Sequence, residues 1–149
     1  MGLAPERAEA VRDLIGRYVG AADRGRAEEL AGLFLPDGVL EVRGDSFDAG
    51  RHAGRAAIRT RIAANVEDAP DVGMIRHHVS SLRMAPLGAG EARADCYFLA
   101  ITPIGPDHWG RYRDRIAFTD AGALFAHREV LHEGFVAGSW LARANAARG

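Results

Sequence analysis

Residues 92–119 read ARADCYFLAITPIGPDHWGRYRDRIAFT, and this stretch decides the fold class. It holds two strand-like runs, 92–102 and 108–119, separated by a turn at 103–106 that contains proline and glycine. Because the connection is short, the two runs are expected to pair in antiparallel fashion. The rest of the second half of the chain repeats this organisation, with strand-like runs at 72–84 and 123–133 and turns at 86–88 and 120–122.

The first half of the chain predicts helices. Apolar residues recur at helical spacing over 5–22, more briefly over 27–34, and again over 55–66. Between these segments the sequence predicts a turn at 36–38, a strand at 39–43 and a loop at 44–54, and the tail 139–149 is either a short helix or a frayed end. We therefore expect an α+β fold, a cone-shaped barrel in which three N-terminal helices pack on a curved, mostly antiparallel sheet of four or five strands around a pocket.

Composition excludes several classes of protein. The chain has 149 residues, enough for one domain spanning 1–149, and its 48% hydrophobic and 26% charged residues are ordinary for a globular protein, not a membrane protein. The net charge of −1 gives no basic footprint for nucleic acid. All 19 basic residues are arginine, which excludes a catalytic lysine, and the single Cys96 excludes a disulfide framework. The N-terminus lacks the apolar run of a signal peptide, which predicts a cytoplasmic protein.

Three residue types could carry chemistry, and each has a structural alternative. His77 and His78 are adjacent in a strand and point to opposite faces, so they cannot bind one metal together, and alternation does not say which one points inward. No metal-ligand spacing occurs, and no metal is expected. Asp23, just past the first helix, could cap the second helix or face a pocket, and Tyr18 could be a buried core aromatic.

Five short motifs together resemble one family. They are Leu14-Ile15-Gly16-Arg17-Tyr18, Ala22-Asp23-Arg24-Gly25, Leu33-Phe34-Leu35-Pro36-Asp37-Gly38-Val39, Arg76-His77-His78-Val79-Ser80-Ser81 and Gly110-Arg111-Tyr112-Arg113-Asp114. The sequence resembles the SnoaL-like branch of the nuclear transport factor 2-like superfamily, which includes scytalone dehydratase, bile acid 7α-dehydratase and hexachlorocyclohexane dehydrochlorinase. The resemblance covers nearly the whole chain, and it identifies the fold more firmly than the reaction.

The resemblance implies three catalytic residues. His77 matches the family's catalytic histidine, Asp23 its pocket aspartate, and Tyr18 the pocket tyrosine of the bile acid dehydratase. The sequence also departs from the family. No arginine occurs at 117–119, where the dehydrochlorinase has a catalytic one, so Arg128 is the nearest late candidate, with a solvated or paired strand arginine as its alternative. Leu124-Phe125 replaces the tryptophan usual at the start of the last strand, and Ser81 replaces an asparagine.

These residues predict an enzyme that needs no cofactor. His77 would act as general base, oriented by Asp23, while Tyr18 donates a hydrogen bond to the oxygen on which charge develops. The expected reaction is an elimination or isomerisation, most simply a dehydration, on an apolar cyclic molecule of polyketide or steroid type. The alternatives are a binding module without turnover and a hydrolase or cyclase using the same pocket. The candidate substrate contacts are Phe34, Phe98, Trp109, Tyr112 and Arg128.

The strand at 92–102 also predicts self-association. Cys96, Phe98 and Ala100 form one apolar set, and the alternating set Tyr97, Leu99 and Ile101 is apolar too. A strand that is apolar on both faces is expected to be covered on both, one side by the pocket and the other by a second subunit. We therefore expect a homo-oligomer, a dimer or a trimer. For a monomer, the segment around Trp140 and Leu141 would instead have to cover that outer face.

Overall fold

The computed structural model describes residues 2–148, apart from the side chain of Asp68. Helices dominate the first half of the chain and strands the second, as the sequence predicts. In chain order the elements are α1 (Pro5–Asp23), α2 (Ala27–Ala31), β1 (Phe34–Gly44), β2 (Gly50–Ala53), α3 (Arg55–Asp68), β3 (Arg76–Pro86), β4 (Glu91–Thr102), β5 (Gly105–Thr119), β6 (Gly122–Phe135) and α4 (Trp140–Arg148).

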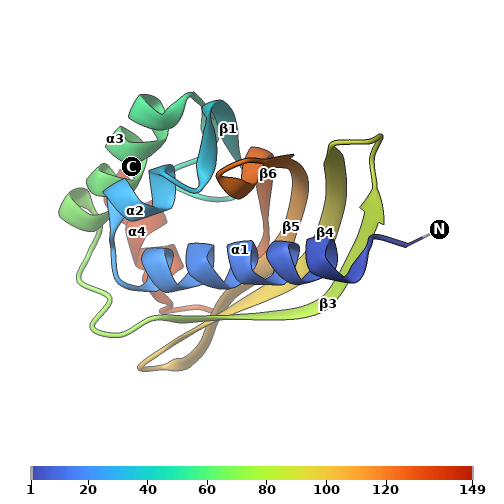
Figure 1. The fold of residues 1–149 in the computed structure, drawn as a ribbon. Coiled ribbons are helices and arrows are strands. Elements are labelled where there is room, and N and C mark those ends of the chain that lie inside the picture. Colours follow the sequence, from blue (N-terminus) through green and yellow to red (C-terminus); the bar gives the residue numbers. More distant parts are fainter. Residues whose placement is uncertain (1, 149) are drawn as a thin grey trace.

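One mixed sheet carries the fold. Its strand order is β2-β1-β6-β5-β4-β3, with every neighbouring pair antiparallel except β1 and β6, which run parallel. Helix α1 lies across the curved sheet, α2 and α3 stack beside its C-terminal end, and α4 lies behind them (Figure 1). The α+β class and the mostly antiparallel sheet are confirmed, and the sheet has six strands where four or five were expected.

Two local predictions in the first half of the chain need correction. The predicted turn at 36–38 lies inside β1, where the pairing with β6 shifts register between Phe34 and Val39. The predicted loop at 44–54 contains the short edge strand β2, which pairs with β1 through Val39 and Ala53. Both features depend on a partner strand, which local periodicity does not reveal. The tail, left open between helix and frayed end, forms helix α4.

A β-bulge in β3 changes which side chains face the core. Ser81 has a backbone φ of 56°, and the pairing with β4 shifts between Ser80 and Arg83. The extra residue moves Leu82 and Met84 onto the face of Val79, and all three pack against the core. Strict alternation through β3 would put Leu82 and Met84 on the face opposite Val79, so the bulge is what brings them to the core.

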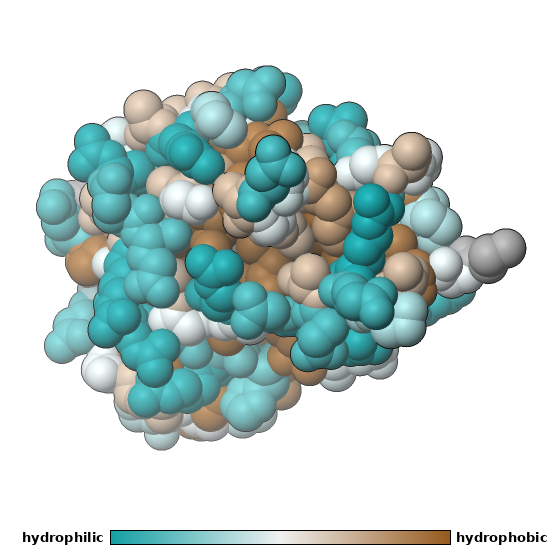
Figure 2. Space-filling model, in the orientation of Figure 1, coloured by the Kyte–Doolittle hydropathy of each residue, from teal (hydrophilic) through white to brown (hydrophobic). Residues whose placement is uncertain are grey.

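The core lies between α1 and the sheet. Val11, Leu14, Ile15 and Tyr18 recur every three or four residues along α1 and are all buried, which explains why this segment is helical and which face it turns inward. Figure 2 shows mostly hydrophilic side chains on the visible face, with hydrophobic ones gathered in a hollow above α1. The described residues include no helix long and apolar enough to cross a membrane.

Candidate active site

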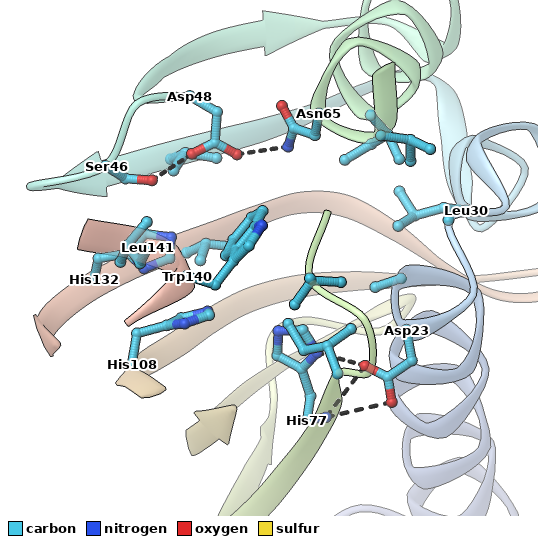
Figure 3. A pocket seen from close by; sticks show the side chains of 18 of the residues that line it. Asp23, Leu30, Ser46, Asp48, Asn65, His77, His108, His132, Trp140 and Leu141 are labelled. Atoms are coloured by element: carbon cyan, nitrogen blue, oxygen red, sulfur yellow. Dashed lines mark hydrogen bonds and ion pairs between the residues drawn. The ribbon is translucent and has the colours of Figure 1, made fainter. Parts of the chain in front are cut away.

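A cavity of about 340 Å³ lies among the sheet, α1, α3 and α4 (Figure 3). Its size and predominantly apolar wall are typical of small-molecule sites. The apolar and aromatic lining residues are Tyr18, Ala22, Leu30, Leu40, Val42, Phe47, Ile62, Val66, Pro70, Val72, Ile75, Phe98, Tyr112, Val130, Trp140 and Leu141. The remaining wall is polar and includes three imidazoles.

Asp23 and His77 meet in this cavity although 54 residues separate them. Asp23 is the last residue of α1, at the negative end of the helix dipole, where a carboxylate needs another source of stabilisation. His77 supplies it twice. Its backbone N–H donates to Asp23 Oδ1 and Oδ2 at 3.1 and 3.3 Å, and its Nδ1 lies 2.5 Å from Oδ1. The carboxylate therefore favours the Nδ1–H tautomer, which leaves Nε2 as the basic nitrogen.

The structure decides both questions that the sequence left open here. His77 lines the cavity, whereas His78 is exposed on the other side of β3. Asp23 does not cap α2, because that helix begins after Arg26 and has no side-chain cap. Of the two histidines, His77 is thus the one that a ligand in the cavity can reach.

Aromatic side chains from three elements form one wall. Tyr18 of α1, Phe98 of β4 and Tyr112 of β5 all line the cavity. The rings of Phe98 and Tyr112 stack at 4.7 Å, and Tyr18 meets Tyr112 edge-on at 5.9 Å. Burial raises the pKa of the Tyr18 phenol, against the opposing charge of Arg128, so the phenol stays protonated and can donate a hydrogen bond.

Three residues expected to contact a substrate do not line the cavity. Phe34 is fully buried beneath Tyr18, with its ring centroid 5.2 Å from that of Phe125. Trp109 is 37% exposed, because alternation in β5 turns it away from the side where His108 and Tyr112 point. Arg128 is completely buried in the core, where it donates two hydrogen bonds of 2.7 Å to Asp114. Arg128 is therefore a paired arginine within the sheet, the alternative that the sequence left open, and not a substrate contact.

Sequence reasoning missed two further imidazoles in the cavity. The ring of His108 lies 6.0 Å from that of His77, and the ring of His132 lies 5.6 Å from that of His108. Burial lowers the pKa of His108, against the effect of Asp107, and lowers the pKa of His132 to about 4. Both rings are therefore neutral near pH 7. The sequence did carry a signal for both residues. His108 alternates with Tyr112 in β5, and His132 alternates with Val130 in β6, so each pair points the same way.

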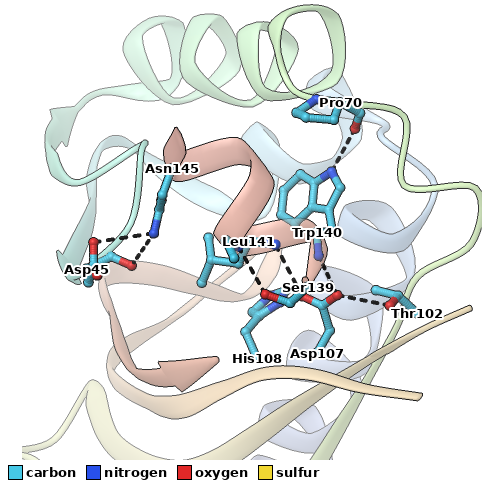
Figure 4. Close-up of polar contacts among 10 residues, drawn as sticks. Asp45, Pro70, Thr102, Asp107, His108, Ser139, Trp140, Leu141 and Asn145 are labelled. Atoms are coloured by element: carbon cyan, nitrogen blue, oxygen red, sulfur yellow. Dashed lines mark hydrogen bonds and ion pairs between the residues drawn. The ribbon is translucent and has the colours of Figure 1, made fainter. Parts of the chain in front are cut away.

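Asp107 connects this row to helix α4 (Figure 4). Its carboxylate accepts hydrogen bonds from His108 Nδ1, the Thr102 hydroxyl and the backbone N–H groups of Trp140 and Leu141. Because Asp107 occupies His108 Nδ1, Nε2 is the nitrogen of that ring left for a ligand. The Trp140 indole donates to the Pro70 carbonyl at 2.7 Å, so the N-terminal end of α4 is held beside the cavity by contacts to both Asp107 and Pro70.

The sequence matches the model of a known family over most of its length. Residues 5–129 match the SnoaL-like domain. The chain belongs to this family. Comparison with curated protein sequences gives no match.

Solved structures place this SnoaL-like domain among nuclear transport factor 2-like, or cystatin-like, folds. A nuclear transport factor 2-like protein from Novosphingobium aromaticivorans is 28% identical, with a TM-score of 0.67 over 95% of this chain and 88% of that chain. A Catenulispora acidiphila protein solved in complex with S-DNPA is also 28% identical, with a TM-score of 0.72 over 84% and 92%. A protein from Novosphingobium aromaticivorans provisionally named a scytalone dehydratase is 21% identical, with a TM-score of 0.72 over 87% and 85%, and shows the shared fold alone.

The site of this SnoaL-like domain is suited to moving protons. One histidine is oriented by a carboxylate, two more imidazoles are neutral, and the phenol of Tyr18 stays protonated. Burial raises the pKa of the Cys96 thiol to about 11, so it is a poor nucleophile. Among residues 2–148, His, Cys, Asp and Glu form no group of three or more that could hold a metal ion.

Proposed function

We propose that this SnoaL-like domain is a lyase or isomerase that removes a proton from carbon in an apolar cyclic molecule, most simply during a dehydration. One observation carries the proposal: Asp23 holds His77 Nδ1 at 2.5 Å in an apolar cavity of about 340 Å³. That contact leaves Nε2 as the basic nitrogen on the side where a ligand can lie.

His77 is the proposed base because it combines a fixed tautomer with a nearby negative charge. As Nε2 takes the proton, the imidazolium keeps its hydrogen bond to Asp23, which stabilises the positive charge. The side chains of His77 and Asp23 are only 15% and 9% exposed, so little water competes for this interaction. His77 can therefore act as a base without a cofactor.

One further group would stabilise the negative charge that develops on the substrate, and another would help to hold the ligand. Tyr18 stays protonated and would donate a hydrogen bond to the carbonyl or leaving oxygen. The ring of His108 lies 6.0 Å from that of His77, and because its Nδ1–H donates to Asp107, its Nε2 can accept a hydrogen bond from the same ligand. Among the relatives, the Catenulispora acidiphila protein with S-DNPA supports small-molecule binding by this fold.

Proton abstraction can be tested without knowing the natural substrate. We would measure exchange of the α-protons of cyclohexanone in D2O by NMR, since that exchange needs only a base and a donor to the carbonyl. The wild-type protein should accelerate the exchange. Replacing the base, His77→Gln, should reduce the acceleration by about 10²–10⁴-fold.

A matched control is available one residue away. His78→Gln makes the same change on the exposed side of β3 and should leave the exchange rate unaltered. Equal exchange by wild-type protein and His77→Gln would contradict the proposal. If cyclohexanone binds in the cavity but is not exchanged, the chain is a binding module, the rival function.

A further inference from the structure

The cavity has a second polar wall that the proposed chemistry does not use. Figure 3 shows Ser46, Asp48 and Asn65 on one side of the cavity, across from Asp23 and His77, with His108 and His132 between the two groups. Ser46 and Asp48 lie in the connection between β1 and β2, and Asn65 lies on α3. The cavity therefore has polar groups at two opposite ends and apolar walls between them.

A chain of hydrogen bonds holds this second wall in place. Arg61 Nε donates to Asn65 Oδ1 at 2.9 Å, which turns the amide nitrogen of Asn65 toward Asp48. That nitrogen donates to Asp48 Oδ2 at 2.8 Å, and the Ser46 hydroxyl donates to Asp48 Oδ1 at 2.5 Å. A carboxylate can accept about four hydrogen bonds, and the amide nitrogen has a second N–H. Asp48 thus keeps acceptor capacity and Asn65 keeps a donor.

The charge of Asp48 has no cationic partner. Among residues 2–148, no arginine or histidine nitrogen forms a salt bridge with its carboxylate, although the side chain is half-buried in the cavity wall. Burial also keeps the neighbouring His108 and His132 neutral by lowering their pKa values. A half-buried carboxylate without a counter-charge gains from a ligand that donates a hydrogen bond.

We infer that Asp48 and Asn65 bind a hydroxyl group of the substrate, at the end of the molecule opposite the carbon that faces His77. A hydroxyl can donate to the Asp48 carboxylate and accept from the second N–H of Asn65 at once. An ammonium group has no lone pair for Asn65, and an ether has no hydrogen for Asp48. The orientation of the substrate rests on the proposed function, whereas hydroxyl binding stands without it.

The test uses three indanes that differ in one substituent. Isothermal titration would compare 5-hydroxyindane, 5-methoxyindane and 5-(aminomethyl)indane. The hydroxyl compound should bind wild-type protein at least about tenfold more tightly than the methoxy compound, since a hydrogen bond to a charged group is worth about that factor. Asp48→Asn should reduce this preference to a few-fold at most, because the amide oxygen that remains accepts only a weaker, uncharged hydrogen bond. Asp37→Asn, the same change at an exposed position outside the cavity, should retain it.

Two more variants separate the possible failures. His77→Gln should keep the preference for the hydroxyl compound. If His77→Gln loses that preference while Asp48→Asn keeps it, the hydroxyl binds at His77 and the inference is overturned. Asn65→Ala keeps the carboxylate and should weaken hydroxyl binding relative to ammonium binding, which decides the matter if Asp48→Asn does not fold. Equal binding of the hydroxyl and methoxy compounds by wild-type protein, or tightest binding of the ammonium compound, would also overturn it.

Discussion

Replacing Arg128 with methionine should cost more stability than any exposed arginine substitution in this protein. The guanidinium is completely buried, donates two hydrogen bonds of 2.7 Å to Asp114, and lies 4.0–4.3 Å from the ring centroids of Tyr18, Tyr112 and Phe125. Burial alone would lower the pKa of Arg128, but the carboxylate of Asp114 raises it above its ordinary value, so the arginine is charged in the folded protein.

The size of the effect follows from what the variant leaves behind. In Arg128→Met the carboxylate of Asp114 remains buried with no cation, and breaking a buried pair in this way costs about 3–5 kcal/mol. That is a large part of the ~5–15 kcal/mol by which domains of this kind are stable. Replacing both partners, as Arg128→Met with Asp114→Leu, removes the uncompensated charge and should recover at least ~2 kcal/mol.

Urea unfolding followed by tryptophan fluorescence would measure these free energies of unfolding. The control is Arg43→Met, whose side chain is 60% exposed and pairs with Glu129 at 3.2 Å, and which should cost less than ~1 kcal/mol. Because burial raises the pKa of Asp114 and Arg128 opposes that rise, the single variant should be less destabilised at pH 5 than at pH 8. A cost for Arg128→Met no greater than for Arg43→Met would refute the reasoning.

Three other predictions concern the site, its pH dependence and assembly. Asp23→Asn should lower cyclohexanone exchange by about 10²-fold or more through loss of the His77 tautomer, and NMR exchange rates matching wild type would contradict this. Burial lowers the pKa of His132 to about 4, below the ordinary value, so the unfolded chain binds more protons between pH 4 and 6.5. The stability that comes from keeping His132 neutral is thus fully present above about pH 6.5, and the free energy of unfolding should fall by up to ~3 kcal/mol as pH drops toward 4. In His132→Gln the free energy of unfolding, measured with urea, should depend less on pH. We also propose a dimer or trimer formed through the outer face of β4, where Tyr97 is 55% exposed. Sedimentation at micromolar concentration should show it, and Tyr97→Glu should shift it toward monomer.

In β4 the alternation of apolar residues predicts which side chains are buried, but it does not say what covers the outer face of the strand. Cys96, Phe98 and Ala100 are buried as alternation predicts, and Tyr97 lies on the other face. The C-terminal segment does not cover that face, because Trp140 and Leu141 line the cavity on the opposite side of the sheet. The C-terminal segment therefore leaves Tyr97 exposed, and the dimer or trimer proposed above would cover it.

Local periodicity was sufficient for the long elements. Helix α1 and the four strands of the second half lie close to the predicted ranges, because their apolar spacing and turn residues act over a few positions. The edge strand β2 and the bulge at Ser81 were missed, since each depends on hydrogen bonds to a neighbouring strand. The motifs around Asp23 and His77 also pointed to the family that the match over 5–129 confirms.

The sequence by itself determined the residue types of the site, whereas the tertiary structure decided which of them meet. Alternation allowed either His77 or His78 to face inward, and the end of α1 selected His77 by placing Asp23 beside it. Arg128 could have faced a substrate, but Asp114 on the adjacent strand holds it in the core. Asp48 and Asn65 are 17 residues apart and form one wall only because α3 folds back over the connection between β1 and β2. Contacts of this kind arise from packing between distant segments, and no short-range spacing in the chain encodes them.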